Sequence, residues 1–483
     1  MPSIAAPGTW LAMLAARATS DEPAVIADGE TWSGRELIER AAGAADFLDT
    51  VGAPIGRPVV ALMASTPTAF ALSIGAAATD RALAPLGPKL TVSELVPIIA
   101  GLDAEVIVTE PACEGLAREV AERTGLRAVV LASVPRSTRE LSFDIAPDRP
   151  AAILHTSGTT GVPKAVEYRQ DRLAARTRVN ADLVMLGPGT TYASASPFHH
   201  IAGIGMLFVA MGSGATLMSL PRFDLDAWDG LAARGATHVL IVPTMVEMLL
   251  DAGRFSLPGL RVLQYGAASI HPDTLARAMT AMPAVKFVNI FGQTEGSPIT
   301  CLTMADHELA AGGRPGLLNS VGRAAPGVEV VIADPDEHGV GEVVAKAAHL
   351  FKPDADGWLR TGDLGRLDEE GYLYLSGRRG DKIIRGGENV YPMEVETVLA
   401  KHPDVAEICV FGVPDRKWGE VVAAAVVVRG EATVDFDALR TFARERLAGF
   451  KVPTVWEQAD ALPRNATGKV LRRELIAART NDD

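Results

Sequence analysis

The sequence is poor in several features that would assign it to a common class of protein. Cysteine occurs only at Cys113, Cys301 and Cys409, far apart in the chain. This argues against a disulfide framework or a cysteine-ligated metal site, and it is typical of a reducing compartment. Basic residues are also scarce, with 46 Lys and Arg against 59 Asp and Glu. The resulting acidic charge argues against nucleic acid or an anionic membrane as a partner of the whole surface.

Long uninterrupted hydrophobic runs are missing as well. Only residues 201–220 are long and uncharged enough to resemble a membrane span, and several glycines interrupt them. We expect a buried helix to about Met211, then a turn and a strand at 215–217. The segment Met1 to Ala5 lacks a basic stretch followed by an apolar one, so no secretory signal is expected. The sequence therefore predicts a soluble, cytoplasmic protein.

Two common nucleotide-binding fingerprints, the Walker loop and Gly-x-Gly-x-x-Gly after a strand, are absent. The apolar run 151–154 leads instead into Thr156-Ser157-Gly158-Thr159-Thr160-Gly161-Val162-Pro163-Lys164. Hydroxyl residues and glycines leave little bulk, so backbone N–H groups and hydroxyls can close around a polyphosphate while Lys164 supplies charge. A flexible polar surface loop is the alternative that this composition alone allows.

The length of 483 residues exceeds the size at which one hydrophobic core keeps growing, so we expect two or more domains. Strand-like and helix-like segments alternate from residue 24 onward, which predicts βαβ units and a mostly parallel sheet between helices. Short β segments come after Gly327, and the glycine- and charge-rich stretch 377–382 leads into a small α+β module. The sequence thus predicts an α/β fold with a large N-terminal domain (1–379), including a β-rich subdomain, and a small C-terminal domain (380–483).

Two further strands end in loops of small residues. The strand at 260–264 leads to Tyr265-Gly266-Ala267-Ala268-Ser269, and the strand at 286–290 leads to Phe291-Gly292-Gln293-Thr294-Glu295-Gly296. Open α/β sheets bind ligands at the carboxyl ends of their strands. Thr294 and Glu295 could simply cap a helix, but a hydroxyl and a carboxylate beside a phosphate loop also suit a phosphate and its Mg²⁺.

Isolated polar residues in loops are weaker signals. The pair His199-His200 has no carboxylate near it in sequence, so structural or pocket-lining histidines are favoured over a metal site. Lys469 ends a turn-rich loop that begins at Leu462, and by composition alone it would be a solvated lysine.

Taken together, the order and spacing of these motifs resemble the adenylate-forming enzymes, which include acyl-CoA synthetases, coumarate ligases, nonribosomal adenylation domains and firefly luciferase. The resemblance covers nearly the whole chain, and residues 156–164 fit the signature [ST]-S-G-[ST]-T-G-x-P-K at every fixed position. It implies ATP-dependent conversion of a carboxylic acid to an acyl adenylate, then transfer to coenzyme A, with AMP and pyrophosphate as the other products. ATP, Mg²⁺ and coenzyme A are the implied co-substrates, and the small domain is implied to rotate between the two steps.

The resemblance also implies a role for each matching residue. The implied phosphate contacts are Thr156, Ser157, Gly158, Thr159, Thr160, Gly161 and Lys164, and the implied adenosine contacts are Gly266, Ala267, Ala268, Phe291, Gly292, Asp363 and Arg378. The implied catalytic residues are Thr294 at the α-phosphate, Glu295 with Thr160 at Mg²⁺, His200 beside the reacting carboxylate, and Lys469 from the small domain. Coenzyme A would meet Gly386, Gly387 and Glu388, and the hinge would lie at Gly380.

Two positions depart from the family pattern. Phe291 stands where a tyrosine is usual, which keeps the stacking face but loses a hydroxyl. Gly380 stands where the family commonly has Asp or Lys, so the backbone is freer to rotate and any ion pair of that side chain is absent.

Three other functions stay open. The first is an acyl-AMP ligase or an adenylation enzyme that loads a carrier protein in trans. The sequence after Lys469 is too short for a carrier domain, and the loop 386–389 favours coenzyme A as the acceptor. The second is a luciferase-like oxygenase, which the ending Asn481-Asp482-Asp483 does not support because it is not a peroxisomal Ser-Lys-Leu. The third is a non-catalytic homologue, which conflicts with the presence of Glu295 and Lys469.

The acyl pocket is expected to come from residues 199–205, 238–248, 266–270 and 291–298. These segments are mostly apolar and hold no Lys or Arg that could pair with a second carboxylate. The sequence therefore favours a fatty, aryl or alicyclic monocarboxylate over a diacid. It leaves open the chain length of that acid and whether the protein is a monomer or a homodimer.

Overall fold

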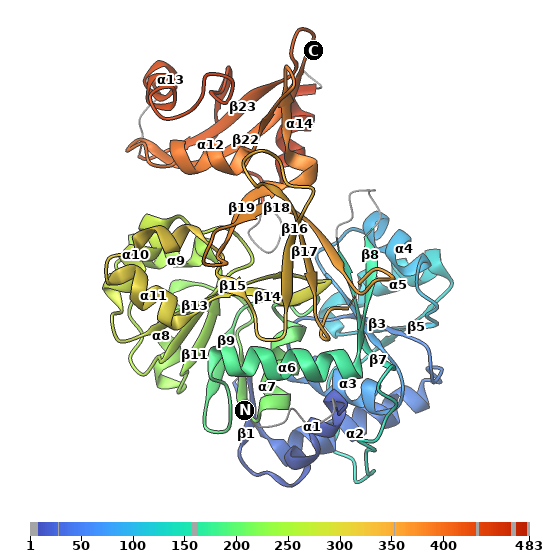
Figure 1. The fold of residues 1–483 in the computed structure, drawn as a ribbon. Coiled ribbons are helices and arrows are strands. Elements are labelled where there is room, and N and C mark those ends of the chain that lie inside the picture. Colours follow the sequence, from blue (N-terminus) through green and yellow to red (C-terminus); the bar gives the residue numbers. More distant parts are fainter. Residues whose placement is uncertain are drawn as a thin grey trace.

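A computed structural model of the chain describes residues 8–27, 29–156, 163–351, 353–430, 434–464 and 470–480. Two large sheets with their helices form a broad lower body, and a four-stranded sheet connects it to a smaller upper body (Figure 1). This is the α/β architecture with a small C-terminal part that the sequence predicts.

The first large sheet has six strands in the order β6-β5-β3-β4-β7-β8. Its strands are β3 (Val59–Leu62), β4 (Leu83–Leu86), β5 (Val106–Thr109), β6 (Arg127–Val130), β7 (Pro150–Thr156) and β8 (Lys164–Arg169). The helices before and between them are α1 (Trp10–Met13), α2 (Gly34–Thr50), α3 (Pro67–Ala78), α4 (Val92–Ala100) and α5 (Glu114–Thr124). All pairs are parallel except β7 with β8, and β3, β4 and β5 are buried throughout, as strands covered on both faces must be.

The second large sheet has nine strands in the order β15-β14-β13-β12-β11-β9-β10-β1-β2. Its strands are β1 (Pro23–Ala27), β2 (Glu30–Ser33), β9 (Thr191–Ser194), β10 (Thr216–Ser219), β11 (His238–Ile241), β12 (Val262–Tyr265), β13 (Lys286–Gln293), β14 (Gly296–Leu302) and β15 (Arg323–Ala324). Its helices are α6 (Gln170–Val184), α7 (Ile204–Ser213), α8 (Leu225–Ala233), α9 (Pro243–Asp251), α10 (Pro272–Ala281) and α11 (Met304–Ala311). The central strands run parallel, so the loops after them gather at one edge.

The apolar run at 201–220 forms the predicted buried helix and strand, α7 and β10. Gly214 ends α7 in the left-handed region, at φ 86°, which a glycine adopts without steric cost. Among the described residues, no helix is both long and apolar enough to cross a membrane.

The remaining strands form two antiparallel or mixed sheets. The connecting sheet consists of β16 (Glu329–Ala333), β17 (Gly341–Lys346), β18 (Leu359–Leu367) and β19 (Leu373–Arg378). The upper body contains β20 (Ile383–Arg385), β21 (Glu388–Val390), β22 (Val405–Asp415), β23 (Gly419–Val428) and β24 (Val455–Gln458), with helices α12 (Pro392–Leu399), α13 (Phe436–Arg444) and α14 (Arg472–Thr480). Leu439 and Ala443 form the buried face of α13, as their spacing predicts.

The two bodies join at a short 3-10 turn, Arg379–Asp381. Arg379 Nη1 lies 3.0 Å from Glu342 Oε2 in the connecting sheet, and Arg472 Nη1 of α14 lies 2.6 Å from Asp381 Oδ2. Gly380 therefore stands between one residue held by the large body and one held by the small body.

Candidate active site

Two antiparallel strands, β7 and β8, flank the predicted phosphate loop. Thr156 and Lys164 face each other as the last pair between β7 and β8. Residues 157–162 lie outside the described residues, and so does Lys469. The contacts predicted for Ser157, Gly158, Thr159, Thr160, Gly161 and Lys469 consequently stay predictions.

The phosphate-loop hairpin meets the tip of a second hairpin, formed by β13 and β14. The Thr156 hydroxyl donates a hydrogen bond of 3.1 Å to Glu295 Oε1, and the Tyr168 hydroxyl on β8 donates to the backbone oxygen of Thr294. Thr294 and Glu295 occupy the turn between two antiparallel strands, which excludes the alternative that they cap a helix. A hydroxyl and a carboxylate thus stand beside the predicted phosphate loop.

Two aromatic residues that sequence reasoning missed hold this junction in place. The Tyr168 ring lies 3.8 Å from the ring of Phe351, measured between centroids, and the Phe351 N–H donates to the Glu295 backbone oxygen at 2.8 Å. Tyr168 is fully buried, and that burial raises the pKa of its phenol well above the usual range. It therefore stays protonated and can donate its hydrogen bond at any working pH.

The loop after β12 and the last residues of β13 bring small residues to the same edge of the sheet. Ala267 adopts φ 67°, a left-handed conformation that costs a non-glycine residue about 1 kcal/mol or more. A Cβ on Gly266 would come within 3.2 Å of the Ile290 oxygen, and one on Gly292 within 2.7 Å of the Gly296 oxygen. With Ala268 exposed and Phe291 half-buried, this edge offers small residues and one ring, as a binding surface for a planar group requires.

Asp363 and Arg378 form an ion pair between β18 and β19 of the connecting sheet. They face each other across β18 and β19, and Arg378 Nε lies 3.0 Å from Asp363 Oδ1. Asp363 is 8% exposed, whereas Arg378 is exposed. A carboxylate accepts hydrogen bonds at about four sites, which is chemistry that suits a pair of ligand hydroxyls.

His200 has a buried ring nitrogen and directly precedes Ile201 and Ala202 of the cavity described below, but it does not itself line that cavity. Its Nε2 has no hydrogen-bond partner in the described part of the chain, and burial lowers the pKa of the imidazole. Its ring centroid lies 4.1 Å from that of His199, whose pKa falls to about 3 because of burial and the charges of His200 and Lys89. Both rings are therefore neutral at pH 7. Among the described residues, no group of three or more His, Cys, Asp or Glu side chains is placed to hold a metal ion.

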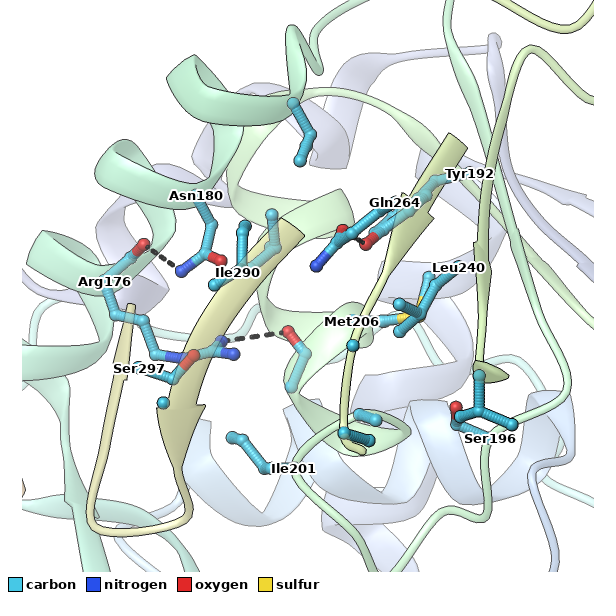
Figure 2. Close-up of a pocket in the computed structure, with 18 of the residues that line it drawn as sticks. Arg176, Asn180, Tyr192, Ser196, Ile201, Met206, Leu240, Gln264, Ile290 and Ser297 are labelled. Carbon is cyan, nitrogen blue, oxygen red and sulfur yellow. Dashed lines mark hydrogen bonds between the residues drawn. The ribbon is translucent and has the colours of Figure 1, made fainter. Parts of the chain in front are cut away.

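A cavity of about 110 Å³ opens beside these loops (Figure 2). The expected segments supply Ile201, Ala202, Gly205, Leu240, Val242, Gly266, Ala267, Gly292, Gln293 and Ser297, and other lining residues include Met206, Val209, Tyr192, Ser196, Gln264 and Ile290.

Helix α6 adds Arg176, Asn180 and Val184 to the lining of this cavity. The expectation that no basic residue lines the pocket is therefore wrong. Sequence reasoning missed Arg176 because α6 follows the phosphate-loop hairpin as an ordinary helix and carries no motif of its own. Its packing against α7 brings Arg176 to the cavity, and the Arg176 guanidinium donates to the Gly205 oxygen at 3.2 Å.

The upper body presents two loops of functional interest. Gly386 and Gly387 form the turn between β20 and β21 with φ 60° and 93°, conformations that favour glycine, and with Glu388 they are exposed. The second loop, which carries Lys469, has its base at the bridge between Arg464 and Val470.

The base of the Lys469 loop lies close to α9 of the large body. Burial is the largest cause that raises the pKa of Glu247 on α9. The charge of Glu407 in the upper body raises this pKa further, and the charge of Arg464 lowers it. Both charges therefore lie near α9. Arg464 itself lies 2.7 Å from Glu407. Helix α9 itself begins directly after Val242 of the cavity wall.

Two family models together match most of the chain. The model described as AMP-binding enzyme matches residues 14–353, and the model described as AMP-binding enzyme C-terminal domain matches residues 394–469. An indoleacetate–CoA ligase of Aromatoleum aromaticum is 35% identical over 72% of this chain and 70% of its own length. A fatty acid–[acyl-carrier-protein] ligase of Streptomyces coeruleorubidus is 32% identical over 94% of this chain and 92% of its own.

The fold comparison agrees with these matches. The ATP-bound structure of MatB from Rhodopseudomonas palustris superposes with a TM-score of 0.89 at 29% identity, covering 98% of this chain and 99% of that one. The resemblance inferred from the motifs is thereby confirmed: the chain belongs to the AMP-binding enzyme family of adenylate-forming ligases.

Proposed function

We propose that this protein is an AMP-forming acyl-CoA synthetase, which activates a carboxylic acid with ATP and passes the acyl group to coenzyme A. The observation that carries the proposal is the contact between Thr156 and Glu295 beside the cavity, because it joins the predicted phosphate loop to a carboxylate next to a space for an acid. Asp363 and the loop 266–268 would hold the adenosine.

In the first step an oxygen of the carboxylate attacks the α-phosphorus of ATP, and pyrophosphate leaves. Negative charge collects on the phosphoryl oxygens, so the main task of the protein is to position the reactants and stabilise that charge. Lys164 and Lys469 would supply positive charge and Thr294 a hydrogen bond. Because His200 is neutral, it can face the attacking carboxylate without pairing with it as a cation.

The residues present fit a Mg²⁺ ion carried in with ATP. Mg²⁺ binds through few protein carboxylates and takes its other ligands from phosphates and water. Glu295, with Thr160, would provide the protein ligands, and the Thr156 hydroxyl would orient the Glu295 carboxylate. When bound, the ion supplies charge that neutralises the phosphate oxygens.

The acceptor in the second step is proposed to be coenzyme A. The exposed hairpin at Gly386, Gly387 and Glu388 has a backbone that a narrow thiol arm could approach closely. One relative is named for a carrier protein, so a carrier acceptor is the second candidate. We also propose that the protein is cytoplasmic and that its two domains divide after residue 379.

The test is exchange of labelled pyrophosphate into ATP in the presence of single acids. The panel spans acetate to palmitate, benzoate, cinnamate, a bulky alicyclic acid and short diacids, with Lys469→Ala as the inactive control. Exchange with one class of acid that collapses in the variant is expected. Adding coenzyme A or an acyl carrier protein then identifies the acceptor, and no exchange with any acid would contradict the proposal.

A further inference from the structure

The cavity holds a buried cation that has no anionic partner among the described residues and that the proposed adenylation step does not use. Arg176 is 6% exposed and its Nε has no hydrogen-bond partner within the described ranges. Its guanidinium donates to the Gly205 oxygen, and no described carboxylate lies within ion-pair distance of it. Burial lowers the pKa of Arg176, but an arginine remains charged in proteins. A buried charge left unpaired is unfavourable, so the site favours an incoming anion.

The surroundings of Arg176 give its guanidinium room. Gly205 lies in the first turn of α7, where the N–H groups of Ile204 and Met206 already donate to the His200 and Gly203 oxygens, so the preference for an anion comes from Arg176 itself. A Cβ on Gly205 would come within 3.1 Å of Arg176 Nη2, so only glycine leaves the guanidinium its full room. Ser297 lines the same cavity. Figure 2 shows the Arg176 side chain extending from α6 toward Ser297.

The size of the cavity limits what the anion can belong to. At about 110 Å³ it is smaller than the roughly 150 Å³ cavity that holds a benzene ring. An acid of a few carbons fits within this space, whereas a long acyl chain would have to extend through its open side. The remaining walls, among them Met206, Val209 and Ile290, would contact its short hydrocarbon part.

We infer that the substrate is a short carboxylic acid with a second anionic group, a carboxylate or sulfonate, that pairs with Arg176. This inference rests on the proposed function and replaces the apolar monocarboxylate expected from the sequence. Arg176 would then determine specificity and take no part in the phosphoryl chemistry. A guanidinium clamped on the attacking carboxylate would withdraw electron density from the nucleophile, which favours pairing with the second group.

The experiment compares acids that differ only in the charge of their far end. Succinate is paired with succinamate and glutarate with glutaramate, and 3-sulfopropanoate serves as the sulfonate arm. Pyrophosphate exchange and calorimetric titration of each acid are measured for wild type, Arg176→Met, Arg176→Lys and Arg178→Met. Arg178 is the matched control, since it lies on the same helix and does not line the cavity.

The inference predicts that wild type prefers a dianion over its amide by about 100-fold or more in kcat/KM, as expected for a lost buried charge pair. Arg176→Met should lose that preference and keep its activity with the amide, Arg176→Lys should retain part of it, and Arg178→Met should change neither. An equal loss for dianion and amide would show that Arg176 serves the reacting carboxylate or the fold, and a preference for the amide would also overturn the inference.

Failure of the proposed function would look different. If no acid supports exchange, adenylation is refuted, and calorimetry alone decides the role of Arg176. Binding of a dianion that Arg176→Met abolishes would still support the anion site. Absence of binding by every dianion would overturn it.

Discussion

The contact between Thr156 and Glu295 unites two motifs that are far apart in the sequence. One side chain ends β7 and the other lies in the turn after β13, yet a single hydrogen bond joins them. Tyr168 and Phe351 fix the same turn through its backbone oxygens. The carboxylate is thereby preorganised, which matters because electrostatic stabilisation depends on groups that need not reorganise during the reaction.

Replacing Glu295 with Gln tests this assignment. The amide oxygen can still accept from Thr156, but the charge that would hold Mg²⁺ is lost. We expect pyrophosphate exchange to fall about 100- to 1,000-fold, the usual cost of removing one preorganised electrostatic group. The control is Glu308→Gln on the exposed face of α11, which should behave as wild type. Activity within a few-fold of wild type in Glu295→Gln would refute the assignment.

Motif residues at this scale could be predicted from the sequence, whereas their supports could not. Thr294 and Glu295 fall in a turn after a strand, where ligand contacts are expected, whereas Asp363 lies within β18 and its role is implied only by the family resemblance. Tyr168 and Arg176 lie within a regular strand and a regular helix, and nothing in their local sequence distinguishes them from other residues of those elements. Only the packing of α6 against α7 brings Arg176 to the cavity.

At the scale of elements, the turn Arg379–Asp381 is the point where the small body can move. Its two ends are tied to opposite bodies, by Glu342 on one side and Arg472 on the other. Gly380 between them is exposed, and a Cβ built on it meets no atom within 4 Å. Rotation at this residue would therefore be opposed by few local contacts.

The variant Gly380→Pro is expected to slow thioester formation more than adenylation, because proline fixes φ near −65° and restricts the turn to one pose. Gly380→Ala is the matched control, since the structure has room for its methyl group. Single-turnover measurements of each half-reaction separate the two steps. Equal loss in both half-reactions would refute the role of this turn as a hinge.

The helices and strands themselves agree closely with the hydrophobic patterns. The run at 201–220 forms α7 and β10 as expected. The predicted strand at 286–290 extends in fact to Gln293, because β13 pairs with β14 through its last residues. That extension could not be predicted locally, since it depends on the partner strand.

For the whole molecule, buried neutral histidines predict how stability depends on pH. Burial is the largest cause that lowers the pKa of His238 and His307 to about 4, against an ordinary value of about 6.5. Between these two values the unfolded chain binds more protons than the folded one. The free energy of unfolding should therefore fall as the pH drops from 6.5 to 4, by up to about 1.4 kcal/mol per pH unit for each such histidine.

Thermal unfolding at several pH values in this range measures the effect. His307→Asn should flatten the dependence, and His338→Asn, at an exposed position, should leave it unchanged. The same slope in His307→Asn and wild type would contradict the account.

The arrangement of whole sheets was predictable only in outline. The alternation of strands and helices predicts parallel sheets, but nothing in it separates the strands into one sheet of six and another of nine. Strand β1, near the start of the chain, joins the sheet whose other parallel strands begin at residue 191. Such long-range pairing depends on the packing of the complete core and not on any local pattern.

The central claim, attack by the acid on the α-phosphorus of ATP, is tested most directly with acid whose carboxylate oxygens are ¹⁸O. The account predicts that, after one turnover with coenzyme A, AMP carries one ¹⁸O atom and pyrophosphate carries none, because the thiol cleaves the bond between the acyl carbon and the bridging oxygen. Appearance of ¹⁸O in pyrophosphate or in inorganic phosphate would show attack at another phosphorus and would contradict the account.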